Sequence, residues 1–455
     1  MDCIIQIERD TFALNSNQIM SFWKNLWSNK LDVTPDVLFG RSYNGILSPQ
    51  QTQAWNQATN YFNQGEFKRS IQSLFEYLNT AHHNNIIAIQ NSNMLEYELV
   101  QGSKVIKILV DQLQFYAEVK IAVCKELHVG FMRKALETNF DLQYARYTLD
   151  EEQHLCLVFD SHLEEASPYK IFNGLKEMAL LADEQDDILI NAFEQLVPIN
   201  INHIIDIDEA QKSIKWTFFN QVIDIITAEG VLGTLNRDRF PGALVYIYLD
   251  AIYKLDYLIK PESKVAEIIN QAHLNYFDKP DENALSKVYA LESKILEFKD
   301  ISKEDFYKEL YHVTHTFEMN SSVPFASICQ IFDTELQGIL WYEENKHDFV
   351  IFAICGYLIG FCLYNYALPQ PVAELSHLYY RIVEPKYFSD LGFMTPYNKT
   401  DDIAKWEYQI KSEVKAILKQ NQSRYPQMNL DVKLDFSSRL KFFISYITLI
   451  RNLNL

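Results

Sequence analysis

The first regular pattern along the chain is a pair of amphipathic helices. Ser48 and Pro49 provide a capped start with proline in the first turn, and the helix they begin is expected to end near Gly65. We predict a helical hairpin similar to one imperfect tetratricopeptide unit. It follows an N-terminal arm, and arm and hairpin form a first unit over residues 1–83. The second helix of the hairpin has apolar residues at helical spacing, namely Phe67, Ile71, Leu74, Phe75 and Leu78.

Between residues 84 and 163 the apolar period shortens from about 3.6 to two residues. In the clearest segment, Phe115 and Val119 alternate with Tyr116, Glu118 and Lys120. This pattern predicts an antiparallel sheet with one solvated face. Helices at 129–139 and from Ser167 onward complete the unit, which is assigned residues 84–198. The strands are expected at 86–90, 94–101, 103–111, 115–123, 144–149 and 154–160, the last two joined by an acidic turn at 150–153.

The remainder of the chain, residues 199–455, has helical periodicity almost throughout. Prolines and glycines separate the segments, as at Gly230 and Pro261. The fold class is therefore α+β: a helical hairpin, a small antiparallel sheet domain with flanking helices, and a large all-α domain. Helices are expected at 208–229, 241–259, 265–272, 281–298, 302–318, 324–342, 349–368, 371–382, 403–419 and 437–451.

One segment raises the question of a membrane span. Phe349 to Leu368 has twenty residues without a charge, with Gly356 and Gly360 in GxxxG spacing. Its flanks are acidic and it contains Asn365 and three tyrosines, so we predict a buried core helix and leave a membrane span as the alternative. No basic segment followed by an apolar run opens the chain, so the protein is expected to be cytoplasmic.

The charge distribution changes the picture more than the composition does. The chain of 455 residues has a net charge of −19, which argues against a nucleic-acid partner. Residues 150–199 contain 12 acidic and 2 basic residues, whereas residues 405–455 contain 9 basic and 4 acidic ones. Two interpretations stay open: the basic C-terminal helices dock on the acidic unit, or the acidic surface attracts a basic partner segment. The partner-binding candidates are Asp183, Glu184, Asp186 and Asp187.

The sequence contains no specific catalytic motif. It has no GxSxG, no GxGxxG and no P-loop, so neither a nucleophile elbow nor a nucleotide cofactor is expected. The six cysteines form no CxxC pair, which favours buried thiols over a zinc site. His312, His315 and Glu318 have a spacing that can present metal ligands on a helix. They lie opposite the apolar stripe of the predicted helix 302–318, so we expect them in solvent and predict no metal or cofactor.

A family resemblance rests on the segment from Phe131 to Leu163. A helix there precedes Asn139, and two strands flank the acidic turn from Asp150 to Gln153 before a closing helix. The second strand carries Leu155, Leu157 and Phe159. With the order of elements around it, residues 66–198 resemble the type III secretion chaperone-like fold, which includes bacterial proteins described as putative sensory-transduction regulators. The resemblance implies a small acidic domain, often dimeric, that binds a partner polypeptide and performs no chemistry.

Three functional hypotheses follow. The first is a non-enzymatic protein-binding protein, chaperone-like or a regulatory scaffold, in which the sheet domain offers an exposed face or edge to a polypeptide. The second is an enzyme with a site in a cleft between the α+β and helical domains. The third is a structural protein that forms a homodimer through the sheet domain.

Overall fold

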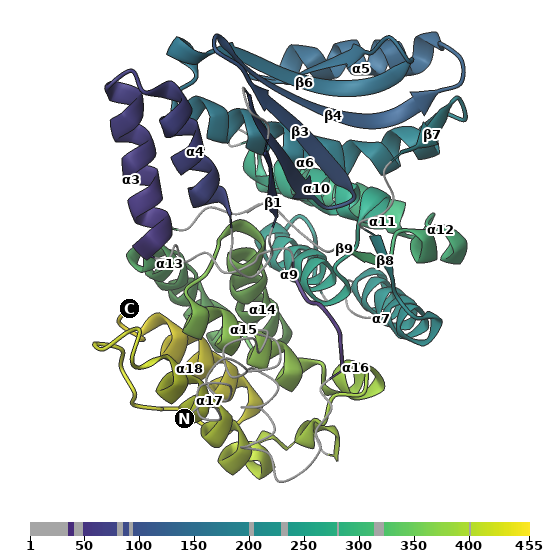
Figure 1. The fold of residues 1–455 in the computed structure, drawn as a ribbon. Helices are drawn as coiled ribbons and strands as arrows, with labels where there is room; N and C mark the ends of the chain where they lie inside the picture. The colour runs from purple at the N-terminus through teal and green to yellow at the C-terminus, as the bar shows by residue number, and fades with distance from the viewer. Residues whose placement is uncertain are drawn as a thin grey trace, which may run out of the picture.

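The computed structural model describes residues 35–40, 49–79, 85–90, 94–199, 204–228, 235–279, 282–313, 323–399 and 402–455. Apart from residues 35–40, the N-terminal arm lies outside these residues. Within them the structure is mixed, with a small antiparallel sheet followed by a large helical part, as the sequence predicts (Figure 1). We call residues 49–198 the sheet region and residues 204–455 the helical region.

The sheet has seven strands, six of which the sequence predicts. Their order is β1-β2-β3-β4-β6-β5, and all of the pairings are antiparallel. The seventh strand, β7 (Leu196–Pro198), was missed and pairs with the end of β4. The others are β1 (Ile86–Gln90), β2 (Leu95–Gln101), β3 (Lys104–Val110), β4 (Gln114–Cys124), β5 (Arg146–Leu149) and β6 (His154–His162).

One face of the sheet is covered by helices, and the other is partly solvated, although Cys156 and Val158 of β6 are buried there. The helix α6 (Pro168–Ala192) begins at its Ser167 cap and contacts β2, β3, β4 and β6. The hairpin helices α3 (Pro49–Asn63) and α4 (Phe67–Leu78) pack against α6, so the hairpin shares its apolar core with the sheet (Figure 1). The predicted alternation in β4 is confirmed, because Phe115 and Val119 are buried while Tyr116, Glu118 and Lys120 are only partly buried.

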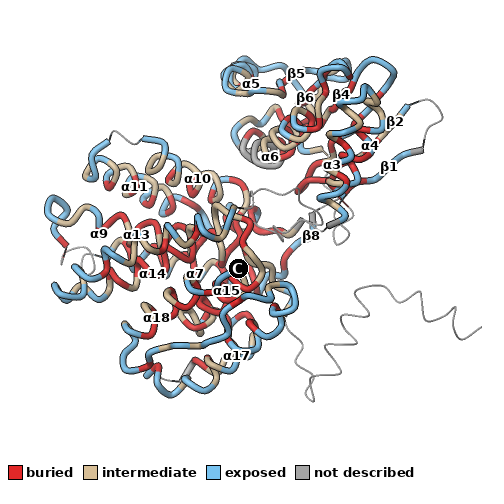
Figure 2. Tube along the Cα trace, turned by 90° about the vertical axis from the view of Figure 1, so that its left-hand side faces the viewer, coloured by how far each residue is buried: buried red, intermediate tan, exposed pale blue. Residues whose placement is uncertain are grey.

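The helical region has a second, separate apolar core. Helices α9 and α14 pack against each other at its centre, with α7, α13, α15 and α18 around them (Figure 2). Its helices are α7 (Glu209–Thr227), α9 (Pro241–Ile259), α10 (Ser263–Phe277), α11 (Ala284–Phe298), α12 (Lys303–Lys308), α13 (Phe325–Glu344), α14 (Asp348–Asn365), α15 (Gln370–Val383), α16 (Pro385–Asp390), α17 (Glu407–Asn421) and α18 (Arg439–Arg451).

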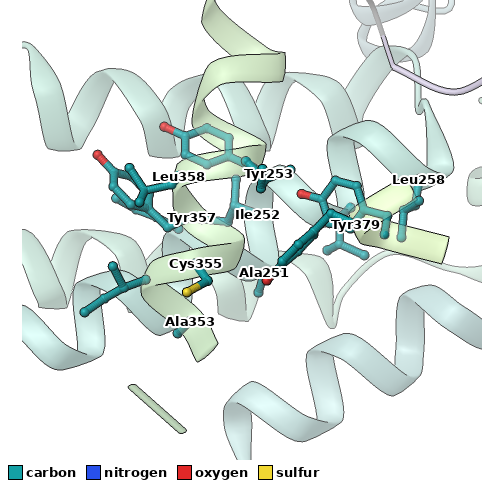
Figure 3. Close-up of a cluster of buried hydrophobic side chains, with 14 of the residues drawn as sticks. Ala251, Ile252, Tyr253, Leu258, Ala353, Cys355, Tyr357, Leu358 and Tyr379 are labelled. Atoms are coloured by element: carbon teal, nitrogen blue, oxygen red, sulfur yellow. The ribbon is translucent and has the colours of Figure 1, made fainter. Parts of the chain in front are cut away.

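Most of the apolar segment predicted at 349–368 forms α14, which packs against α9 in this core (Figure 3). Among the described residues it is the one helix long and apolar enough to cross a membrane, and 67% of it is buried inside the fold. The two glycines of the GxxxG spacing both lie against α9. A Cβ at Gly360 would lie 2.5 Å from the Cβ of Tyr253 on α9, and one at Gly356 would meet the carboxylate of Asp250. Glycine here permits close packing of two helices.

One expectation about the second half of the chain was wrong. The predicted helix 302–318 stops after one short helix, α12, and Tyr311–Val313 form a strand, β9, that pairs with β8 (Ile204–Asp206). Of the two interpretations left open for the charge distribution, the structure does not show the basic C-terminal helices docked on the acidic unit, because α17 contacts α15, and α18 contacts α13 and α14, far from the sheet (Figure 1).

Candidate protein-binding surface

Helix α5 (Val129–Asp141) has apolar side chains on two opposite faces. Phe131 and Ala135 are buried in the core of the sheet region. On the other face, Val129, Met132, Leu136 and Phe140 are 78%, 38%, 70% and 91% exposed. Their spacing of three, four and four residues places them in one line along the helix. We call these four residues the α5 stripe. Such a line of exposed apolar side chains is typical of an interaction surface.

The helix that carries the stripe is held firmly. The side chain of Asn139 accepts a hydrogen bond from the backbone N–H of Tyr147 at 2.6 Å and donates to its carbonyl at 3.3 Å, which ties α5 to β5. At the other end, the ring of His128 accepts from the N–H of Gly130 at 3.2 Å as an N-cap. The buried Phe131 packs edge-on against Phe193. The stripe is therefore presented on a positioned helix.

A carboxylate from α6 fixes the chain between α5 and β5. The two oxygens of Glu177 accept hydrogen bonds from the backbone N–H groups of Gln143, Tyr144 and Ala145, each at 2.8 Å. These donors have no strand partner at that point, so one ionised side chain satisfies three of them. This contact joins the segment that follows α5 to α6.

Charged residues accompany the stripe on one side. Arg133 and Glu137 lie one turn apart and form an exposed ion pair with a distance of 2.8 Å between Nε and Oε1. Arg133 precedes the midpoint of the stripe and Glu137 follows it, so the flank carries a positive and then a negative charge. A pair of this kind contributes little to helix stability, at most about 0.5 kcal/mol.

The four acidic residues proposed from the sequence, Asp183, Glu184, Asp186 and Asp187, lie within the span of α6. Their side chains lie outside the described residues, so their role in binding stays a prediction. They lie on α6 and the stripe lies on α5, so the two candidate surfaces belong to different helices.

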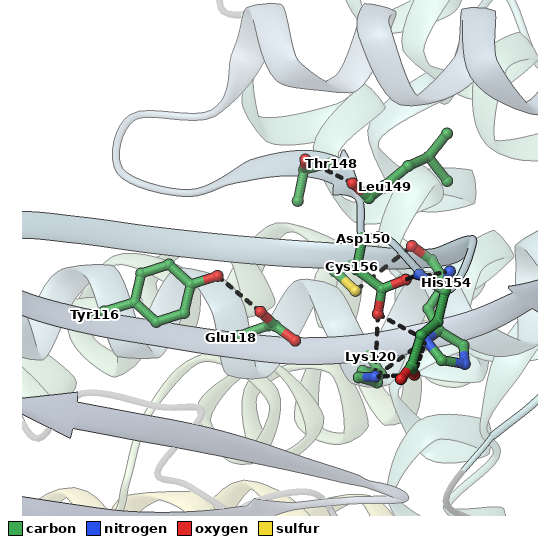
Figure 4. Close-up of polar contacts among 9 residues, drawn as sticks. Tyr116, Glu118, Lys120, Thr148, Leu149, Asp150, His154 and Cys156 are labelled. Carbon is green, nitrogen blue, oxygen red and sulfur yellow. Dashed lines mark hydrogen bonds and ion pairs between the residues drawn. The ribbon is translucent and has the colours of Figure 1, made fainter.

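The solvated face of the sheet carries a polar cluster beside the acidic turn (Figure 4). Lys120 Nζ lies 3.0 Å from Asp150 Oδ2 and 3.4 Å from Glu152 Oε2, and His154 Nδ1 lies 2.6 Å from the same Asp150 oxygen. Burial would raise the pKa of Asp150, but hydrogen bonds from His154 and Lys120 lower it well below its usual range. The carboxylates and imidazole have metal-ligand spacing, yet the Lys120 ammonium already occupies the position a cation would take. The cluster therefore stabilises the turn between β5 and β6.

The histidine candidates are placed differently from the prediction. His312 lies in β9 instead of on a helix, and both of its ring nitrogens are buried without a hydrogen-bond partner among the described residues. Burial, reinforced by the nearby Lys215 and Lys260, lowers its pKa to about 4. His312 is thus a neutral, partly buried side chain instead of a solvated one, and His315 and Glu318 lie outside the described residues.

Sequence reasoning missed the α5 stripe although its signal is present. The helix was predicted, but its residues are apolar on two faces, and the period alone does not say which face meets the sheet. Comparison with known proteins adds no guide, because no family model matches the chain and no curated protein matches it significantly. The site is interpreted from its geometry.

Proposed function

We propose that this chain is a cytoplasmic, non-enzymatic protein-binding protein of a chaperone-like or regulatory kind, and that a polypeptide docks on the α5 stripe. The observation that supports the proposal is the exposure of Val129, Met132, Leu136 and Phe140 in one line on a helix whose opposite face is buried. An apolar line of this length matches the apolar face of a second helix. The resemblance of residues 66–198 to chaperone-like domains agrees with this function and stays a hypothesis.

The occupant we assign to the stripe is a second copy of this chain. Isologous pairing uses the same patch on both copies. When two α5 helices lie antiparallel around a two-fold axis through the middle of the stripe, Arg133 of one copy lies beside Glu137 of the other. The flank is therefore self-complementary. One helix of this length buries less than the roughly 800 Å² per partner of a standard interface, so we expect a weak, exchangeable dimer with a Kd on the order of micromolar.

Analytical ultracentrifugation of the full chain over a range of concentrations tests this assignment. We expect self-association in the wild type and a monomer for Leu136→Glu, because the substitution places two buried charges at the centre of the pair. Leu296→Glu is the matched control, since Leu296 is 56% exposed on α11 and should leave association unchanged. A wild type that stays monomeric throughout, or a Leu136→Glu variant that still dimerises, would contradict the proposal.

A charge exchange tests the two-fold geometry separately. Arg133→Glu places an acidic residue beside the acidic Glu137 of the second copy, at both ends of the pair, and should weaken the dimer. Adding Glu137→Arg reverses both charges and restores the match, so the double variant should recover wild-type association. If the double variant associates no better than the single one, antiparallel pairing through α5 is wrong.

A further inference from the structure

A cavity of about 710 Å³ that opens to the surface lies in the helical region between α7, α9, α14, α15 and α18. Most of its wall is apolar, with aromatic rings from four of these helices. Ligand sites are typically cavities of this size with mostly apolar walls and a few converging polar groups. The aromatic part of the wall comprises Phe218, Phe349, Phe352, Tyr379 and Phe443.

Three charged side chains form the floor of this cavity. Lys254 Nζ lies 3.1 Å from Glu384 Oε1 and 3.5 Å from Asp250 Oδ2, and these side chains are only 15–25% exposed. Two carboxylates thus share one ammonium, which leaves one negative charge in excess in a largely buried place. The other oxygen of Asp250, Oδ1, is buried against Gly356 without a hydrogen-bond partner. An excess carboxylate charge in a largely buried place is unfavourable unless a further cation balances it.

The rim differs from the floor. Lys346 and Arg439 are exposed there, and neither forms an ion pair with any of the described residues. The guanidinium of Arg439 lies over the rings of Phe352 and Phe443, at 5.9 and 5.8 Å. Because these two cations are in contact with water, salt screens them, whereas the floor carboxylates act inside the cavity where screening is weak.

We propose that this cavity binds an amphipathic organic amine, with its ammonium group on Asp250 and Glu384 and its apolar body against the aromatic wall. The ammonium supplies the positive charge that balances the excess carboxylate, and its N–H groups donate to carboxylate oxygens other than the enclosed Asp250 Oδ1. The rings of the wall favour a cation or an apolar body at their faces. This site lies within the helical region and is independent of the α5 stripe.

Three probes with the same phenyl-ethyl body test the proposal on the full wild-type chain. Phenethylamine carries an ammonium, 2-phenylethanol is neutral, and 3-phenylpropionate is an anion. We expect calorimetric titration at pH 7 to give a Kd for the amine at least about ten-fold lower than for the alcohol, as one charge-assisted contact provides. Equal binding of amine and alcohol, preferred binding of the acid by the rim cations, or no binding of the amine at millimolar concentration would each overturn the proposal.

Variants then place the amine on the floor. Asp250→Asn and Glu384→Gln preserve shape and should each weaken phenethylamine binding about ten-fold without affecting 2-phenylethanol. The matched control is Glu335→Gln, because Glu335 bonds to Tyr246 and does not line the cavity. Amine binding unchanged in both floor variants, or lost equally in the control, would contradict the assignment. The three-probe comparison on the wild type decides the question should a variant not fold.

Discussion

The sheet region and the helical region place their unusual residues in opposite ways. The sheet region holds the ion-pair cluster around Lys120 and Asp150 at the solvated face of the sheet and leaves the α5 stripe in contact with water. The helical region contains the larger of the two apolar cores and keeps the charged side chains of Asp250, Lys254 and Glu384 only 15–25% exposed. The first arrangement offers a surface to another macromolecule, and the second offers an interior to a small one. The predictions below test this contrast.

The largest effect is expected from removing the single cation of the cavity floor. Lys254→Met leaves Asp250 and Glu384 facing each other with no ammonium between them, and we expect a loss of about 3 kcal/mol in the free energy of unfolding. Urea denaturation at pH 7 measures it. The comparison variant is Lys386→Met on α16, whose ion pair with Asp390 is exposed and should contribute less than about 1 kcal/mol. A Lys254→Met variant as stable as this control would mean that the floor charges are effectively solvated.

Next in size is the close packing of α9 and α14. A methyl group at Gly360 would lie 2.5 Å from the Cβ of Tyr253 and 2.9 Å from the hydroxyl of Tyr380. A Cβ atom does not rotate away, so the two helices have to separate, and Gly360→Ala should lower the free energy of unfolding by about 2–3 kcal/mol. Gly338 on α13 has nothing within 4 Å of the same position, and Gly338→Ala should stabilise by up to about 1 kcal/mol. Two variants of equal stability would refute the role of Gly360.

The sequence predicts individual helices and strands better than it predicts which of them contact each other. Six strands follow from alternation and turn residues, and most helices follow from periodicity and caps. The strand β9 was missed because Leu310 and Val313 continue the apolar spacing of the helix that ends before them. Its pairing with β8 involves residues more than a hundred positions away, and such a contact leaves no local pattern.

The charged cluster of the cavity also depends on contacts that leave no local pattern in the sequence. Asp250 and Lys254 are an unusual pair of charges inside the apolar helix α9, and this was a local signal. The third member, Glu384, comes from the end of α15, and only the tertiary fold brings it within 3.1 Å of Lys254. Likewise, the exposed face of α5 follows from how Glu177 and Asn139 orient that helix. Periodicity identifies a face, and long-range contacts decide where it points.

The two regions should also respond to pH with opposite signs. Burial, reinforced by Glu384 and opposed by Lys254, raises the pKa of Asp250 to about 6, above its unfolded value of about 3.9. Its protonated form therefore favours folding below pH 4, and this stability is lost as the pH rises through 6. The pKa of Asp150 is lowered, so its contribution is present above about pH 4 and is lost as the pH falls further.

Asparagine variants separate the two contributions. Relative to the wild type, Asp250→Asn should gain stability between pH 4 and 7, by at most about 3 kcal/mol, while Asp150→Asn should lose stability in the same range and approach the wild type at lower pH. Urea unfolding from pH 3 to 7 measures both differences. If the free energy of unfolding changes with pH in the same way in both variants, there is no contrast between a buried charge that opposes folding and a surface charge that supports it.

The smallest effect on stability is expected at Glu177, which holds the segment that follows α5. This prediction links stability to the proposed function. Glu177→Gln keeps the size of the side chain but replaces an ionised acceptor for three backbone N–H groups by a neutral amide, and we expect a loss of about 1–2 kcal/mol. Hydrogen exchange should increase at residues 143–145 and not in the helical region. Because α5 then loses its fixed orientation, self-association should weaken although the stripe itself is unchanged. Association at the wild-type level despite faster exchange would show that the stripe binds without its support from α6.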